Sequence, residues 1–105
     1  MREINRKELK DKLNKDDVTL IEVLEPAEYE KGHIKHAINI PLETIVTEAR
    51  EKFPFDEEIV VYCSDYDCTA SPAAAKKLED TGFKNIYHYP GGKKDWREAG
   101  LPIER

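Results

Sequence analysis

The chain has 105 residues, of which 39% are hydrophobic and 37% are charged, a length and composition typical of one globular domain spanning residues 1–105. Its formal net charge of −5 disfavours binding to a phosphate backbone, so we expect no nucleic-acid partner. The chain has no apolar run of membrane-spanning length, and its charged start MREINRKELK is unlike a secretory signal. We therefore expect a cytoplasmic protein that has no membrane partner.

The first third of the chain predicts two helices around one buried strand. Asn5 is a good N-cap for a helix over residues 6–13. The largely apolar, β-branched run 18–24 has the length and composition of a strand that is buried on both faces. Pro26 can open a short helix, which Gly32 would close.

The middle of the chain predicts two strands that flank an amphipathic helix. Residues 37–40 form a brief strand candidate that Pro41 stops. From Leu42 to Pro54 the apolar residues follow helical spacing. The clearest strand is 58–62, with the sequence EIVVY.

The last third continues this alternation of strand and helix. Ser71 and Pro72 are predicted as the N-cap and first residue of a helix that runs to Gly82. Residues 85–89 follow as a strand, and Trp96 lies in a final helix. Because the connections are too long for hairpins, we expect an α/β fold, with a central, mostly parallel sheet covered by helices on both faces.

Cys63 directly follows the strand 58–62, where parallel sheets bind their ligands. The following helix directs free N–H groups and the positive end of its dipole toward the segment 64–70. That field favours the thiolate, the reactive form of a nucleophilic cysteine. Cys63 is therefore the candidate catalytic nucleophile; the alternative is a small buried residue that closes the strand.

Cys68, five positions further on, leaves three alternatives open. It can be a resolving thiol for Cys63, a nucleophile itself, or a loop residue without a chemical role. A disulfide between the two would require Cα atoms within roughly 7 Å. Two cysteines without histidines at ligand spacing make a poor zinc site, so we expect no metal, and we expect no organic cofactor.

The loop backbone around the start of this helix is the candidate substrate-binding element, because its N–H groups can hold an anion. Asp65 and Asp67 either solvate the loop or select a cationic or protein-borne partner. The loop residues concerned are Ser64, Asp65, Tyr66, Asp67, Thr69, Ala70 and Ser71.

Several short motifs occur in order along nearly the whole chain. They are Leu20-Ile21-Glu22-Val23, Glu28-Tyr29, Gly32-His33-Ile34, Ala37-x-Asn39-Ile40-Pro41, Tyr62-Cys63, Ser71-x-x-Ala74-Ala75-x-x-Leu78, Gly82-Phe83 and Gly91-Gly92-x-x-x-Trp96-x-x-x-Gly100-x-Pro102. The ordered set resembles the rhodanese-like sulfurtransferase domains. The resemblance implies a small rhodanese-like domain in which Cys63 carries sulfane sulfur as a persulfide, held by loop N–H groups, and passes it to a thiophilic acceptor.

The chain departs from the family pattern in its active-site loop. The family loop often ends in arginine, whereas the corresponding position here is Cys68 counted from Cys63, or Ala70 counted back from Ser71. Counted in the second way, the loop is two residues longer. Without that arginine, and with two loop aspartates, we do not expect the dianion thiosulfate to be the natural donor. A small sulfur compound or a persulfidated thiol or protein is the expected partner.

Two other functions remain open at this point. The missing arginine favours a non-catalytic rhodanese-like module that binds another protein through its acidic loop face. The long loop favours a cysteine-dependent phosphatase or arsenate reductase-like enzyme, a weaker alternative because such enzymes clamp the oxyanion with arginine.

The remaining candidates are predicted to be structural or exposed. In the family, the residue corresponding to His33 is mostly structural, and we expect His36 and His88 at the surface. Lys93 and Lys94 are predicted to lie on a solvated helix face, and Gly91-Gly92 is predicted to form a tight turn.

Overall fold

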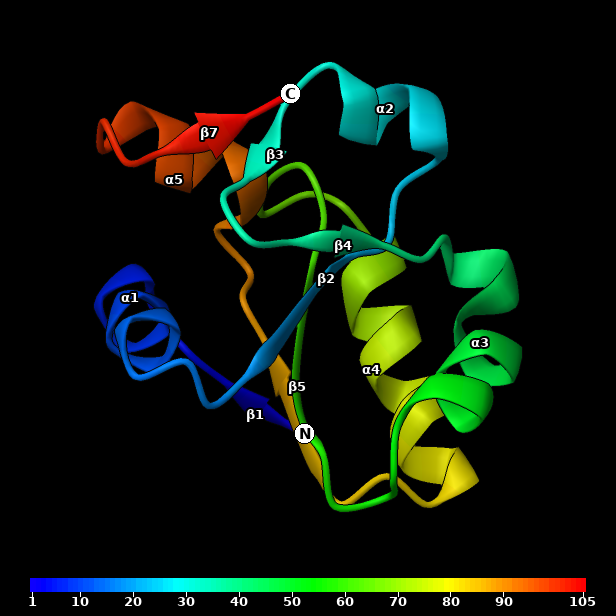
Figure 1. Ribbon diagram of the computed structural model, residues 1–105. Helices are drawn as coiled ribbons and strands as arrows, with labels where there is room; N and C mark the ends of the chain where they lie inside the picture. Colours follow the sequence, from blue (N-terminus) through cyan, green and yellow to red (C-terminus); the bar gives the residue numbers. More distant parts are fainter.

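A five-stranded parallel β-sheet forms the centre of the computed structural model, which describes residues 1–105 (Figure 1). The strands, in spatial order, are β1 (Arg2–Glu3), β6 (Asn85–His88), β5 (Glu58–Tyr62), β2 (Thr19–Glu22) and β4 (Ile38–Asn39). All four neighbouring pairs are parallel. A separate antiparallel pair joins β3 (His33–Ile34) to β7 (Ile103–Glu104).

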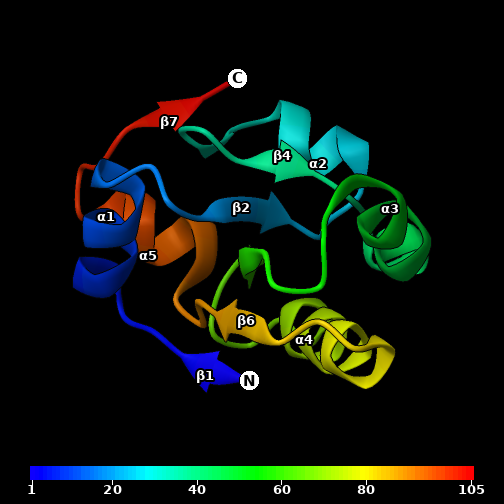
Figure 2. The ribbon, with the colours of Figure 1, turned by 60° about the horizontal axis from the view of Figure 1, so that its bottom comes forward.

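Helices cover both faces of this sheet, as Figures 1 and 2 show. One face carries α3 (Ile45–Lys52), which follows a 3-10 turn η1 (Leu42–Thr44), and α4 (Ala70–Thr81); the other carries α1 (Arg6–Asn14) and α5 (Gly92–Glu98). The short helix α2 (Pro26–Glu30) follows β2. The predicted α/β fold with a covered, mostly parallel sheet is confirmed. No helix is both long and apolar enough to cross a membrane.

The alternation along β5 divides the core into two clusters. Ile59, Val61 and Cys63 belong to the cluster under α3 and α4, whereas Val60 and Tyr62 belong to the cluster under α1 and α5. All five are buried, and each large apolar side chain buried in this way stabilises the fold by about 1.5–3 kcal/mol. Neighbouring residues of one strand therefore serve opposite faces of the sheet.

Most local predictions agree with the structure. Asn5 caps α1 through a capping box, in which its Oδ1 accepts the Glu8 N–H (2.8 Å) and Glu8 Oε1 accepts the Asn5 N–H (3.0 Å). Pro26 opens α2, and Gly82 ends α4 with φ of 124°. The predicted strand 58–62 coincides with β5.

The structure differs from the predictions in very short strands and in one side chain that contacts residues distant in the sequence. The prediction of Ser71 as an N-cap is wrong: α4 begins at Ala70, and Thr69 occupies the N-cap position. The Ser71 hydroxyl instead makes contacts inside the protein. β1, β3 and β7 were not predicted, because their two residues lie in no longer strand pattern, whereas the equally short β4 lies within the candidate 37–40.

Candidate functional site

The loop that carries Cys63 is held at the carboxyl edge of the sheet by α5. The N–H groups of Lys93 and Lys94 donate to the carbonyl oxygens of Cys63 (3.0 Å) and Ser64 (2.9 Å). This close approach requires glycine at position 92, where a Cβ atom would lie 2.5 Å from the Cys63 carbonyl oxygen and where φ is +63°. The structural interpretation of the Gly91-Gly92 pair is therefore confirmed.

Cys63 and Cys68 form a disulfide in the structure, with Cα atoms 6.4 Å apart. The Cys63 side chain is buried, with 1% of its surface exposed, whereas Cys68 is partly exposed and packs against the edge of the core. The structure thus brings the two candidate thiols together, as a resolving role for Cys68 requires. The roles of both thiols stay predictions.

The loop between the two cysteines is shaped by Asp65. Its carboxylate accepts the N–H of Asp67 (3.0 Å), and its carbonyl oxygen accepts the N–H of Cys68 (3.2 Å). Tyr66 stands at the tip with 72% of its surface exposed. The N–H groups of Ser64, Asp65, Tyr66 and Thr69 donate no hydrogen bond within the protein, so they are free to bind a ligand.

Behind Cys63 lie two buried polar side chains, Ser71 and His88. The Ser71 Oγ is 3.1 Å from Cys63 Sγ and 2.8 Å from His88 Nε2. His88 is only 5% exposed, so its predicted place at the surface is wrong. The signal that could have placed it is the alternation along β6, where Ile86 and His88 are both buried. His36, by contrast, is exposed.

The environment of His88 disfavours its protonated form. Burial lowers the pKa of the imidazole below its ordinary value of 6.5, and the nearby Glu3 carboxylate opposes this effect. The Glu3 Oε2 lies 3.6 Å from Nδ1, which has no hydrogen-bond partner. The ring is therefore neutral near pH 7.

A second buried polar cluster lies on the other face of the sheet. The fully buried Glu22 pairs with Lys93 (Nζ to Oε2, 3.1 Å), and its Oε1 accepts a hydrogen bond from the Tyr62 hydroxyl (2.9 Å). The Lys93 ammonium also donates to the Glu28 carbonyl oxygen (2.9 Å), and Tyr62 accepts the Ile34 N–H (3.1 Å). Burial, followed by the Glu22 charge, raises the pKa of Tyr62. The prediction that Lys93 lies on a solvated face is wrong, since it is 7% exposed.

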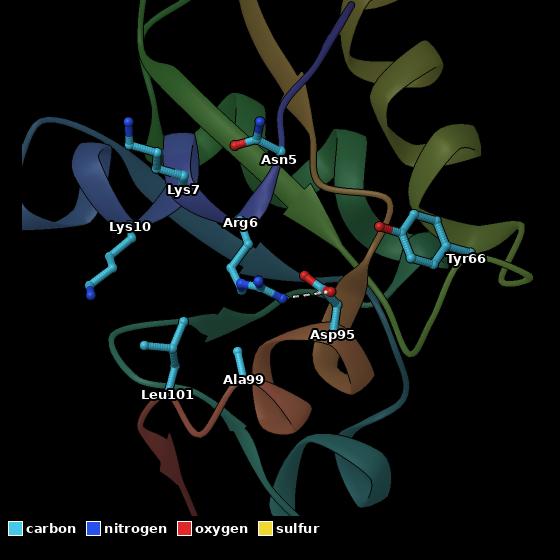
Figure 3. A pocket seen from close by; sticks show the side chains of 8 residues that line it. All are labelled: Asn5, Arg6, Lys7, Lys10, Tyr66, Asp95, Ala99 and Leu101. Atoms are coloured by element: carbon cyan, nitrogen blue, oxygen red, sulfur yellow. Dashed lines mark hydrogen bonds and ion pairs between the residues drawn. The ribbon is translucent and has the colours of Figure 1, made fainter.

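Two cavities flank the loop, and cationic side chains line both. The first, about 540 Å³, is bordered by Ser64 and Asp65. The second, about 600 Å³, lies between α1, α5 and the loop, and Figure 3 shows the Tyr66 hydroxyl directed toward the Arg6–Asp95 ion pair. The cationic residues of the first cavity are Lys31, Lys93, Lys94, Arg97 and Arg105, and those of the second are Arg6, Lys7 and Lys10. Asp65 therefore borders a cavity with several cationic side chains, and the exposed Tyr66 borders another.

The sequence is similar to a known domain family and to several characterised proteins. Residues 5–99 match the description of the rhodanese-like domain. An HTH-type transcriptional regulator of Mycobacterium tuberculosis is 36% identical over 101 residues, covering 96% of this chain and 44% of the regulator. The thiosulfate sulfurtransferase GlpE of Vibrio cholerae is 32% identical over 85 residues, covering 81% of this chain and 77% of the enzyme.

The fold is also shared with solved structures. A thiosulfate sulfurtransferase from Pseudomonas aeruginosa superimposes with a TM-score of 0.89 at 26% identity. The match covers 100% of this chain and 20% of the Pseudomonas chain.

Proposed function

The chain belongs to the family of rhodanese-like domains, and on that premise we propose that it is a sulfurtransferase or persulfide carrier that uses Cys63 as its nucleophile. The observation that carries the proposal is the position of Cys63, which directly follows β5 beside the start of α4 and is joined to a second cysteine, Cys68. The 32% identity to a thiosulfate sulfurtransferase supports the same reaction class.

The first step loads sulfur onto Cys63. Its thiolate attacks the outer sulfur of a donor R–S–S⁻, the donor S–S bond breaks, and R–S⁻ leaves. The product is the persulfide Cys63–S–S⁻, whose outer sulfur carries the negative charge. The unbonded N–H groups of Ser64, Asp65, Tyr66 and Thr69 are the donors available in the loop to stabilise that charge.

Two routes remove the sulfur. In the first, an acceptor thiolate attacks the outer sulfur, takes it as a new persulfide and restores the Cys63 thiolate. In the second, the outer sulfur first takes a proton from water to give Cys63–S–SH. The Cys68 thiolate then attacks the inner sulfur, the persulfide S–S bond breaks, HS⁻ leaves and the Cys63–Cys68 disulfide forms. The disulfide in the structure is the product expected of this second route, and a dithiol reductant would return it to two thiols.

The charges around the loop favour one class of donor. Asp65 and Asp67 disfavour a compact dianion such as thiosulfate next to the reacting sulfur. The cavity beside Ser64 is lined by cationic side chains, Lys94, Arg97 and Arg105 among them, which suits a larger persulfidated thiol with carboxylates distant from its sulfur. A small-molecule or protein-borne persulfide is therefore the proposed donor.

Mass spectrometry of the reduced protein tests this function donor by donor. After treatment with polysulfide or a persulfidated low-molecular-weight thiol, the wild type should gain about 32 Da, one sulfur atom, and thiosulfate should give less of this adduct. Cys63→Ser should gain nothing. Cys68→Ser should keep the added sulfur longer and release less sulfide, because the second route is closed. Absence of the adduct with every donor, or its persistence in Cys63→Ser, would refute the proposal.

A protein-binding role without catalysis is the second candidate. The exposed Tyr66 beside the loop acids is the observation that favours it, because an exposed aromatic residue is a common anchor at protein interfaces. The same adduct measurement separates the two functions, since a binding module forms no persulfide on Cys63.

A further inference from the structure

A continuous line of polar atoms leads from Cys63 away from the loop and into the sheet. From Cys63 Sγ, it passes to Ser71 Oγ (3.1 Å), to His88 Nε2 (2.8 Å) and on to the Glu3 carboxylate, which is 3.6 Å from Nδ1. The four residues come from the end of β5, the first turn of α4, β6 and β1. In the ladder between β1 and β6, Glu3 is the register partner of His88; Figure 2 shows β1 at the edge of the sheet.

In the reduced protein, one arrangement of the protons on His88, Ser71 and Cys63 directs each of them toward an acceptor. A neutral His88 with its proton on Nδ1 directs that N–H toward the Glu3 carboxylate and leaves Nε2 as an acceptor. The Ser71 hydroxyl then donates to Nε2, and its free lone pairs accept the S–H of Cys63. The arrangement places a neutral base one hydroxyl away from the thiol.

The surroundings of His88 keep this base available. The charged group that faces the ring is Glu3, on β1. The other residues beside the ring are uncharged: Ser71 from α4, and Val61 from β5, which is the register partner of His88. No cation therefore opposes protonation of the ring, while Glu3 can stabilise the imidazolium once it forms.

We propose that His88 is a positioning residue that takes up the proton of Cys63 through Ser71 and so generates the thiolate. The Cys63 proton passes to Ser71 Oγ, and the hydroxyl proton passes to His88 Nε2. The products are a Cys63 thiolate, an intact Ser71 hydroxyl and a His88 imidazolium facing the Glu3 carboxylate. No oxidant, reductant or further reactant is needed. The inference rests on the proposed function, because it supplies the thiolate that attacks the donor.

Thiolate formation can be measured without any sulfur donor, so this test is separate from that of the proposed function. In a Cys68→Ser background, Cys63 is the sole thiol, and the ultraviolet absorbance of its thiolate is followed against pH. His88→Gln and Ser71→Ala should each move the midpoint of this titration upward by about one pH unit, a tenfold loss of thiolate below the midpoint. His36→Asn is the matched control: His36 is an exposed histidine whose positive φ asparagine tolerates, and its midpoint should not move.

Two outcomes would overturn the proposal. One is an unchanged midpoint in both His88→Gln and Ser71→Ala. The other comes from NMR titration of the ring nitrogens in the Cys68→Ser background, which needs no substitution at His88 and so remains decisive if His88→Gln fails to fold. The midpoint at which His88 loses its proton should be higher than in the Cys63→Ser, Cys68→Ser double variant, because the Cys63 thiolate stabilises the imidazolium. Independent titration of the two groups would refute the relay, whereas a failed persulfide assay with an intact relay would refute only the proposed function.

Discussion

Tyr62 and Cys63 are neighbours in the chain, yet each leads into a different buried polar cluster. Tyr62 joins Glu22 and Lys93 on the face under α1 and α5, and Cys63 joins Ser71 and His88 on the face under α4. In the first cluster, both carboxylate oxygens and the ammonium of the central ion pair are hydrogen-bonded. In the second, His88 Nδ1 has no hydrogen-bond partner.

The comparison indicates that one buried polar cluster stabilises the fold, whereas the other is able to change its protonation state. A satisfied ion pair fixes charge and geometry, and losing one partner leaves an uncompensated buried charge. In the second cluster, His88 can take up a proton beside the Glu3 carboxylate, which would stabilise the new charge. α5 connects the two clusters, since the Lys93 side chain belongs to the first while its N–H holds the Cys63 carbonyl.

The largest expected effect comes from breaking the ion pair. Lys93→Met should lower the free energy of unfolding by about 3–5 kcal/mol, because Glu22 would stay buried and charged without its partner. The double variant Lys93→Met with Glu22→Gln should recover much of this loss, since it leaves no buried charge. Lys94→Met, at the neighbouring exposed position, should change stability by less than about 0.5 kcal/mol. Urea unfolding measures all three, and equal losses at Lys93 and Lys94 would contradict the contrast between the clusters.

Gly92→Ala tests the backbone link between α5 and the cysteine loop. Gly92 and Gly100 both have positive φ, but a Cβ atom would overlap the Cys63 carbonyl oxygen only at Gly92; at Gly100 nothing lies within 4 Å. Both substitutions should cost about 1–2 kcal/mol for the left-handed backbone. Gly92→Ala should cost at least about 1 kcal/mol more, because the loop must shift. Thermal unfolding of both variants gives the comparison, and equal losses would show that the loop adapts freely.

Tyr62→Phe removes one hydroxyl from the satisfied cluster. The Ile34 N–H and one Glu22 oxygen lose their partner, so we expect a loss of about 1–3 kcal/mol. Tyr87→Phe is the control, since the Tyr87 hydroxyl makes no hydrogen bond in the structure and its ring stacks under the Lys12 ammonium. A neutral result for Tyr62→Phe in urea unfolding would mean that water replaces the lost hydroxyl.

The smallest effect is a pH dependence from His88. Its pKa is lowered on folding by burial, so the unfolded chain binds the proton more readily than the folded one. The contribution of His88 to the free energy of unfolding is therefore fully present above the ordinary pKa of about 6.5, and it falls as the pH drops through that value. The loss of stability on acidification should be smaller in His88→Gln, measured by urea unfolding at several pH values. An identical pH dependence in both proteins would contradict a buried neutral His88.

Sequence reasoning identified the elements that local pattern controls. The continuous apolar run of β5, the cap at Asn5 and the glycine that ends α4 depend on residues within a few positions of one another. The place of Cys63 at the strand end follows from the same local pattern. Sequence reasoning failed for Ser71, because its hydroxyl is used by a histidine 17 positions away and not by its own helix.

What the sequence alone determined was thus the order of strands and helices, the parallel α/β class and the candidate cysteine, because hydrophobic periodicity and capping are local. The tertiary structure alone decided that Lys93 pairs with Glu22, 71 residues away, that His88 lies behind Cys63, and that the two thiols meet. Burial and partner choice depend on which distant segments the sheet brings together. A lysine or histidine has the same identity in the sequence whether packing leaves it in water or encloses it beside a carboxylate.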